Sequence, residues 1–257
     1  MITSKVTVGI VIISIIFKCN FAEDLNQDTT KPGDIARKKC KEYAAYVPTS
    51  YECPFGSYDE QPLGRSFATL EEFPHTKKED EDTFWLCTGS LISEKHVVIA
   101  AHCLRNARNI SPSDQVIRLG TANFNMTEHV QDHEIKEILI HPDYNQYSSV
   151  NNIALIELKR AAEINQYVRP PCLFTGKEFD FEQAVASGWT TSDSIFADDD
   201  DGSYEALQKA VLEIYTEERC KEIYFPATRR SKDKKVISYE TMVCAGTKFI
   251  VTRTVVI

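Results

Sequence analysis

Residues 97–104, VVIAAHCL, most constrain what this chain can fold into. Three consecutive β-branched residues predict a buried strand, and the two alanines that follow leave room for another backbone. His102 then lies where the predicted strand leaves the core, a position that suits a proton carrier facing a cleft. A second strand is predicted at 85–92, and a bridge between its Cys87 and Cys103 would hold His102 in place. An isolated histidine is more often structural, but the neighbouring alanines and cysteines favour a catalytic position here.

Several short segments resemble the trypsin/chymotrypsin family of serine proteases. Residues 88–92 (TGSLI) followed by 100–103 (AAHC) resemble the histidine region of that family. Residues 184–189 (AVASGW) are similar to the strand that the family ends with Gly-Trp-Gly, and 242–246 (MVCAG) match closely. The resemblance covers about residues 62–246.

The resemblance implies an all-β fold of two packed barrels. Short strand-like runs recur between turn signals beyond His102, which independently indicates a barrel or sandwich. We expect a trypsin-like double β-barrel over residues 62–257. Its first barrel, about 62–165, is predicted to be complete, and its second, 166–257, to be incomplete at the C-terminus because the family pattern stops after Gly246.

The N-terminal region predicts secretion. Lys5 precedes an apolar run at 6–17 that is too short to span a bilayer comfortably, and the run is followed by a small residue at Ala22. We therefore expect a signal peptide over residues 1–22 rather than a membrane anchor. Residues 23–61 are polar and lack periodicity, which predicts an irregular, pro- or light-chain-like segment. Eight cysteines agree with an extracellular compartment.

The family resemblance also implies cysteine pairs. Cys40 would pair with Cys172 and tether the N-terminal segment, and Cys220 would pair with Cys244. Cys53 is then left over, either free or bonded to another chain, and an incidental role is favoured. The two glycosylation sequons begin at Asn109 and Asn125, of which Asn125 is the better candidate because Pro112 follows the first.

The catalytic residues implied by the resemblance are not all present. The family reaction needs a serine nucleophile, a histidine base and a buried aspartate, with backbone donors for the oxyanion. His102 is retained, but Asn152 stands at the aspartate position, and no Gly-Asp-Ser-Gly segment occurs in the sequence. An amide at Asn152 can donate to His102, which favours the wrong tautomer, and it cannot stabilise the imidazolium. The nucleophile is therefore predicted to be absent and the chain to be inactive.

Three interpretations of this chain follow. The first is a secreted serine protease homologue that binds proteins, including cascade proteases, in an extracellular cascade. The alternative is a fragment or isoform of an active trypsin-like endopeptidase that cleaves after basic residues, and a misassembled product without function is a third. Asn152 favours the first reading. Pro62 also favours the first interpretation, because Gln61 and Pro62 occupy the junction where family zymogens are cleaved.

No cofactor or metal is expected. His129, His133 and His141 match no zinc-ligand spacing. A calcium site is not expected either, because Thr121 stands about where an acidic ligand of the family's calcium loop would be. The formal net charge of −9 disfavours a nucleic-acid partner, and no membrane partner is expected.

Overall fold

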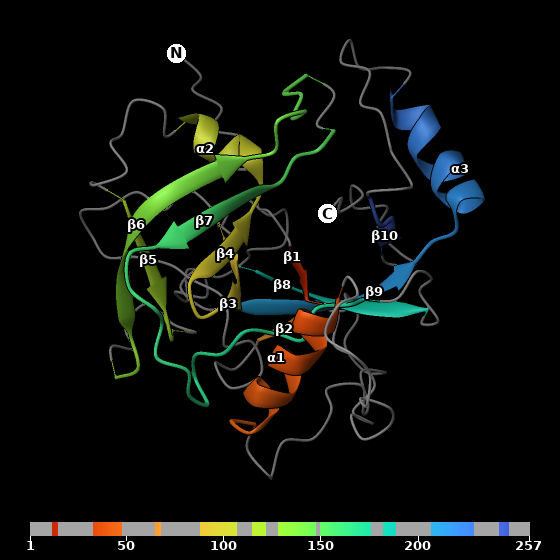
Figure 1. The fold of residues 1–257 in the computed structure, drawn as a ribbon. Coiled ribbons are helices and arrows are strands. Elements are labelled where there is room, and N and C mark those ends of the chain that lie inside the picture. The colour runs from red at the N-terminus through yellow and green to blue at the C-terminus, as the bar shows by residue number, and fades with distance from the viewer. Residues whose placement is uncertain are drawn as a thin grey trace, which may run out of the picture.

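The computed structural model describes residues 12–14, 33–47, 65–67, 88–106, 115–121, 128–147, 150–175, 182–188, 207–228 and 242–246. Within these ranges the chain forms two five-stranded sheets and three helices (Figure 1). The strands are β1 (Ile12–Ser14), β2 (Arg65–Phe67), β3 (Ser90–Ser93), β4 (His96–Ile99), β5 (Val116–Leu119), β6 (Gln131–Ile140), β7 (Ala154–Leu158), β8 (Gln183–Gly188), β9 (Gln208–Ile214) and β10 (Ala245–Gly246). The helices are α1 (Asp34–Ala44), α2 (Ala101–Asn106) and α3 (Glu217–Thr228). The sheet-rich architecture confirms the predicted all-β, trypsin-like fold class.

The first sheet has the order β3-β4-β7-β6-β5 and curls around an apolar core (Figure 1). Side chains on β4 and β7 alternate between buried and partly exposed, as expected where one face of a sheet packs inward. Leu91, Ile156 and Leu158 are at most 1% exposed and lie in this core. All five strands fall within residues 62–165, where the first barrel was predicted.

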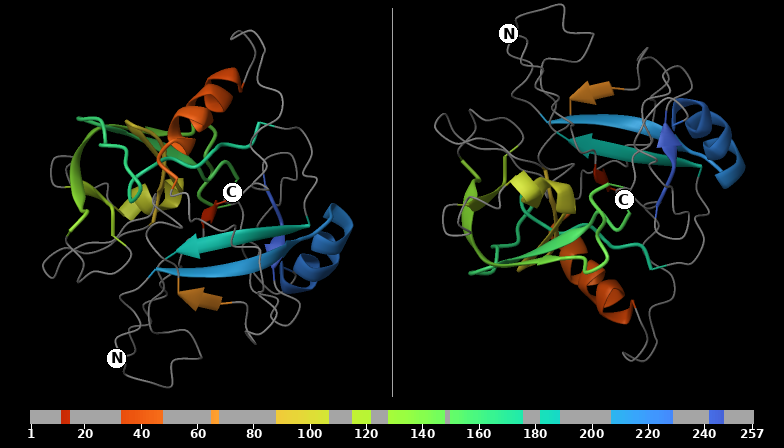
Figure 2. Two further views of the ribbon diagram at one scale, coloured as in Figure 1. Left: turned by 90° about the horizontal axis from the view of Figure 1, so that it is seen from below. Right: turned by 90° about the horizontal axis from the view of Figure 1, so that it is seen from above.

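The second sheet has the order β1-β8-β9-β10, and β2 also pairs with β9. Figure 2 shows β8 and β9 side by side, apart from the first sheet, with α3 beyond their end. Residues 184–188 of β8 are buried, and Ala184 and Ala186 pack with Leu212 and Ala245. β1 pairs with the other edge of β8 and lies within the predicted signal peptide. If residues 1–22 are removed on secretion, β9 is the one described strand that still pairs with β8.

The prediction of an irregular segment over residues 23–61 is wrong for residues 34–44, which form α1. The helix follows Gly33, whose φ of 92° suits glycine at the turn into the helix. Asp34 in the first turn and Lys41 in the last turn complement the helix dipole, and Arg37 forms an ion pair with Asp34. The buried Tyr43 and the disulfide-bonded Cys40 lie three residues apart on one face of the helix, but this pattern is too short within a charged segment to predict the helix from the sequence. Within the described residues, none of the helices combines the length and the apolar composition that a membrane span needs.

Contacts with the turn between β3 and β4 hold α1 against the first sheet. Lys39 Nζ lies 2.7 Å from Glu94 Oε1 in that turn and 2.7 Å from Glu42 Oε2 within the helix. Tyr43 is 4% exposed, and burial, together with the nearby Glu94 carboxylate, raises its pKa to about 12. Burial acts to raise the pKa of Glu94, but the hydrogen bond from Lys39 and further hydrogen bonds lower it overall. The ionised pair therefore links the N-terminal helix to the first sheet.

Glu94→Gln should loosen α1. Both partners of the ion pair are about one-third exposed, so we expect amide exchange in α1 to be only about two- to five-fold faster at neutral pH. Because the pKa of Glu94 is lowered in the folded protein, its ion pair contributes fully to the free energy of unfolding above the ordinary carboxyl pKa. That contribution is lost as the pH falls through the lowered pKa. Hydrogen exchange measured by mass spectrometry checks this. Glu222→Gln is the matched control, since it removes an exposed ion pair with Arg219 within α3, and an equal effect of the two variants on α1 would contradict the assignment.

Gly120→Ala should destabilise the first sheet strongly. Gly120 follows β5 with a φ of 78°, and an added Cβ would collide with the backbone carbonyl oxygen of His129. We expect the free energy of unfolding to fall by about 2 kcal/mol or more, measured by denaturant titration. Gly246→Ala is the control, because its Cβ would meet the Tyr215 ring at 3.1 Å without a positive φ. A loss at Gly246 equal to that at Gly120 would contradict this account.

Candidate functional site

The pairing of β4 with β7 brings His102 and Asn152 together. The two strands are antiparallel, with Ile99 opposite Ala154. The chain beyond Ile99 and the chain before Ala154 therefore leave the sheet at the same end. His102 follows Ile99 by three residues and Asn152 precedes Ala154 by two, so residues 50 positions apart in the sequence meet there.

Two hydrogen bonds join Asn152 to His102. The backbone N–H of His102 donates to Asn152 Oδ1 over 2.9 Å, and Asn152 Nδ2 lies 2.8 Å from His102 Nδ1. A backbone N–H can only donate, so the atom that it meets must be the amide oxygen. The amide NH₂ then faces the imidazole, and because it can only donate, Nδ1 must accept.

This arrangement decides where the histidine carries its proton. With Nδ1 accepting, the proton of the neutral ring lies on Nε2. A histidine base in a serine protease needs the opposite form, with Nδ1–H bonded to a carboxylate and a lone pair on Nε2. The structure therefore brings the two predicted residues into contact in the geometry that favours the unproductive tautomer.

The surroundings of His102 keep it in place. It lies in α2, where its neighbours Ala101 and Cys103 are 0% and 4% exposed and Leu104 is also buried. Cys103 is disulfide-bonded. Cys87 lies outside the described residues, so the Cys87–Cys103 pair stays a prediction.

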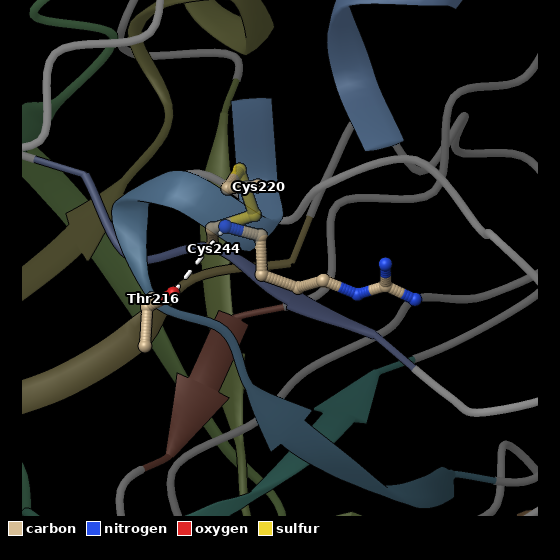
Figure 3. Close-up of a disulfide and its surroundings, with 4 residues drawn as sticks. Thr216, Cys220 and Cys244 are labelled. Atoms are coloured by element: carbon tan, nitrogen blue, oxygen red, sulfur yellow. Dashed lines mark hydrogen bonds between the residues drawn. A yellow bond between two sulfur atoms is a disulfide. The ribbon is translucent and has the colours of Figure 1, made fainter. Parts of the chain in front are cut away.

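The structure contains two further cysteine pairs that the family resemblance implied. Cys40 of α1 is bonded to Cys172, with their Cα atoms 4.8 Å apart. Cys220 of α3 is bonded to Cys244, which immediately precedes β10 (Figure 3). Beside this bond Thr216 Oγ1 accepts a hydrogen bond of 3.3 Å from the backbone N–H of Arg219 and so caps α3. Asn109, Asn125 and Cys53 lie outside the described residues.

The three histidines considered as metal ligands are engaged separately. His129 stacks on Tyr167 with ring centroids 3.6 Å apart. His133 is buried on β6, and His141 Nδ1 accepts a hydrogen bond from the backbone of Asp143. Among the described residues no three His, Cys, Asp or Glu side chains gather closely enough to hold a metal ion.

Asn151 is a site residue that sequence reasoning missed. It directly precedes Asn152 and has a φ of 55°. The one sequence signal is its residue type, because asparagine tolerates the left-handed region better than most residues. Because every asparagine shares this tolerance, the residue type does not predict a site without the backbone geometry.

Comparison with known proteins identifies the family. The trypsin family model matches residues 63–253. Serine protease snk of Drosophila melanogaster is 33% identical over 168 residues, covering 65% of this chain and 36% of the relative. Serine protease SSP1 of Scolopendra subspinipes is 32% identical over 166 residues, covering 63% and 51%. Phenoloxidase-activating factor 3 of Holotrichia diomphalia is 30% identical over 223 residues, covering 78% and 58%. The chain thus spans between about a third and three-fifths of the length of these relatives.

The family match takes in every described strand from β2 to β10 and both members of the His102–Asn152 contact, and leaves out β1. It covers well over half of the 257 residues. The sheet-rich architecture agrees with it. This chain belongs to the trypsin family.

Proposed function

We propose that this chain is a trypsin-family homologue that does not cleave peptide bonds by the family mechanism and acts by binding other proteins outside the cell. The carrying observation is the contact of 2.8 Å between the Asn152 amide nitrogen and His102 Nδ1. An aspartate in that place accepts the Nδ1 proton, leaves Nε2 able to take a proton and stabilises the imidazolium. The amide does none of these three things.

The size of the defect can be gauged from general serine protease chemistry. An asparagine in place of the triad aspartate lowers kcat by about 10⁴-fold, which corresponds to roughly 5.5 kcal/mol in activation free energy. The remaining scaffold would still present a shaped protein surface. A role in binding other proteins therefore requires only the surface that the chain retains, and not the catalytic chemistry.

Exposed apolar side chains beside the site support a protein partner. Ile153 adjoins Asn152 and is 40% exposed, and Ile140 and Tyr147 of the same hairpin are 40% and 76% exposed. Aromatic and aliphatic side chains in such positions are typical of protein interfaces. The names of the relatives, among them clotting factor C of Tachypleus tridentatus and phenoloxidase-activating factor 3, suggest cascade proteases as the partners.

The proposal includes secretion. A signal peptide over residues 1–22, an N-terminal segment over 23–61 and a protease-like domain over 62–257 form the proposed organisation. The disulfides Cys40–Cys172 and Cys220–Cys244 suit an oxidising compartment. Glycosylation at Asn125 would accompany passage through the secretory pathway.

The secreted full-length chain should not hydrolyse an arginine ester above a buffer blank and should not be labelled by a fluorophosphonate. His102→Ala serves as the matched control, because any hydrolysis by the family mechanism must vanish with the histidine. Hydrolysis by the wild-type chain that is lost in His102→Ala would instead support the alternative of an active trypsin-like enzyme.

Asn152→Asp should move the His102 proton from Nε2 to Nδ1. A carboxylate accepts where the amide donates, so the preferred tautomer reverses. Nitrogen-15 chemical shifts of the imidazole distinguish the two forms. Asn145→Asp is the control, since its side-chain oxygen accepts a hydrogen bond from the Tyr147 backbone and has no role at His102. A wild-type ring that already carries its proton on Nδ1 would contradict the proposal that Asn152 holds His102 in the Nε2–H form.

A further inference from the structure

Asn151 combines an unusual backbone conformation with a place beside the candidate site. It is the one non-glycine residue of the described ranges with a positive φ, at 55°. This left-handed conformation crowds the Cβ of an L-residue, and asparagine adopts it more readily than most. Such outliers persist where the surrounding structure holds them.

The hairpin is closed on both sides of the Asn151–Asn152 dipeptide. Toward the sheet, the His141 N–H donates to the carbonyl oxygen of Ile153 over 3.1 Å. Toward the tip, the Asn145 N–H donates to the carbonyl oxygen of Val150, also over 3.1 Å. Residues 142–144 on one arm thus face only 151–152 on the other, so the two asparagines lie in an irregularity of the ladder that is fixed at both ends.

Two further hydrogen bonds define the conformation inside this irregularity. Asn151 Nδ2 donates to the carbonyl oxygen of Asp143 over 3.3 Å and crosses from one arm to the other. The Ile153 N–H donates to the carbonyl oxygen of Asn151 over 2.8 Å. The second bond closes a three-residue turn with Asn152 at its centre. From this turn the Asn152 side chain makes both of its contacts with His102.

We propose that Asn151 is a positioning residue that aims Asn152 at His102 and thereby sets the tautomer of the histidine. Its left-handed backbone sets the direction in which the chain enters the turn centred on Asn152, and its amide ties that entry to the opposite arm. This inference deepens the proposed function, because it rests on the same hydrogen bond between Asn152 and His102. It assigns to Asn151 a role carried out entirely through its neighbour.

The test is imidazole nitrogen-15 spectroscopy of the full-length chain carrying Asn151→Val or Asn151→Gly. Valine disfavours the left-handed region, so we expect the population of the native conformation at residue 151 to fall about five-fold or more and the Nδ1–H form of His102 to become visible. Glycine adopts positive φ freely but lacks the amide that bonds to Asp143, so Asn151→Gly should shift the tautomer clearly less than Asn151→Val. Asn145→Ala removes an asparagine hydrogen bond from the same hairpin and should leave the His102 signals unchanged.

An unchanged tautomer in Asn151→Val would overturn the proposal, as would an equal change in Asn145→Ala. If Asn151→Val gives no folded spectrum, Asn151→Ala is judged by the same criteria, because alanine also disfavours positive φ. Hydrolysis of an arginine ester by the wild-type chain would contradict the proposed function alone. The tautomer comparison among the variants would still decide the role of Asn151.

Discussion

The antiparallel pairing of β4 with β7 is the interaction on which the rest of the structure depends. It places Val97 opposite Ile156 and Ile99 opposite Ala154, and these four side chains belong to the core of the first sheet. In this register β4 ends and β7 begins at the same end of the sheet, where the chain enters α2 on one side and leaves the β6–β7 hairpin on the other. Burial of the apolar residues thus sets the distance between His102 and Asn152. A slip of one residue would turn the core side chains to the other face, so the site inherits its geometry from the core.

At that end of the sheet the chemistry depends on the identity of one atom. The backbone N–H of His102 requires an oxygen of residue 152, and both aspartate and asparagine supply it. The second atom of the side-chain head then faces Nδ1 of the imidazole. An oxygen there would accept a proton and leave Nε2 basic, whereas the nitrogen of Asn152 donates and moves the proton to Nε2. The scaffold can therefore keep the arrangement of a catalytic pair while reversing its direction of proton donation.

The N-terminal helix is attached to this scaffold both covalently and electrostatically. The Cys40–Cys172 disulfide anchors α1 to the segment that follows the first sheet, and Lys39 reaches Glu94 in the β3–β4 turn. Glu94 also has Tyr43 beside it, and burial of this tyrosine keeps its hydroxyl protonated to high pH. A segment that joins the protein at two separated points adds order at little cost in chain entropy, because the disulfide already restricts the unfolded chain.

The sequence by itself determined the all-β class, the family resemblance and the residues His102 and Asn152, because β-branched runs and short motifs are local signals. It did not predict α1, because the inward face of that helix is short and lies within a charged segment. Only the tertiary structure decided which atom of Asn152 faces the imidazole, since that choice depends on a backbone N–H supplied by a residue 50 positions away. Only the tertiary structure decided that Asn151 adopts a left-handed turn, because that conformation is imposed by hydrogen bonds across the hairpin.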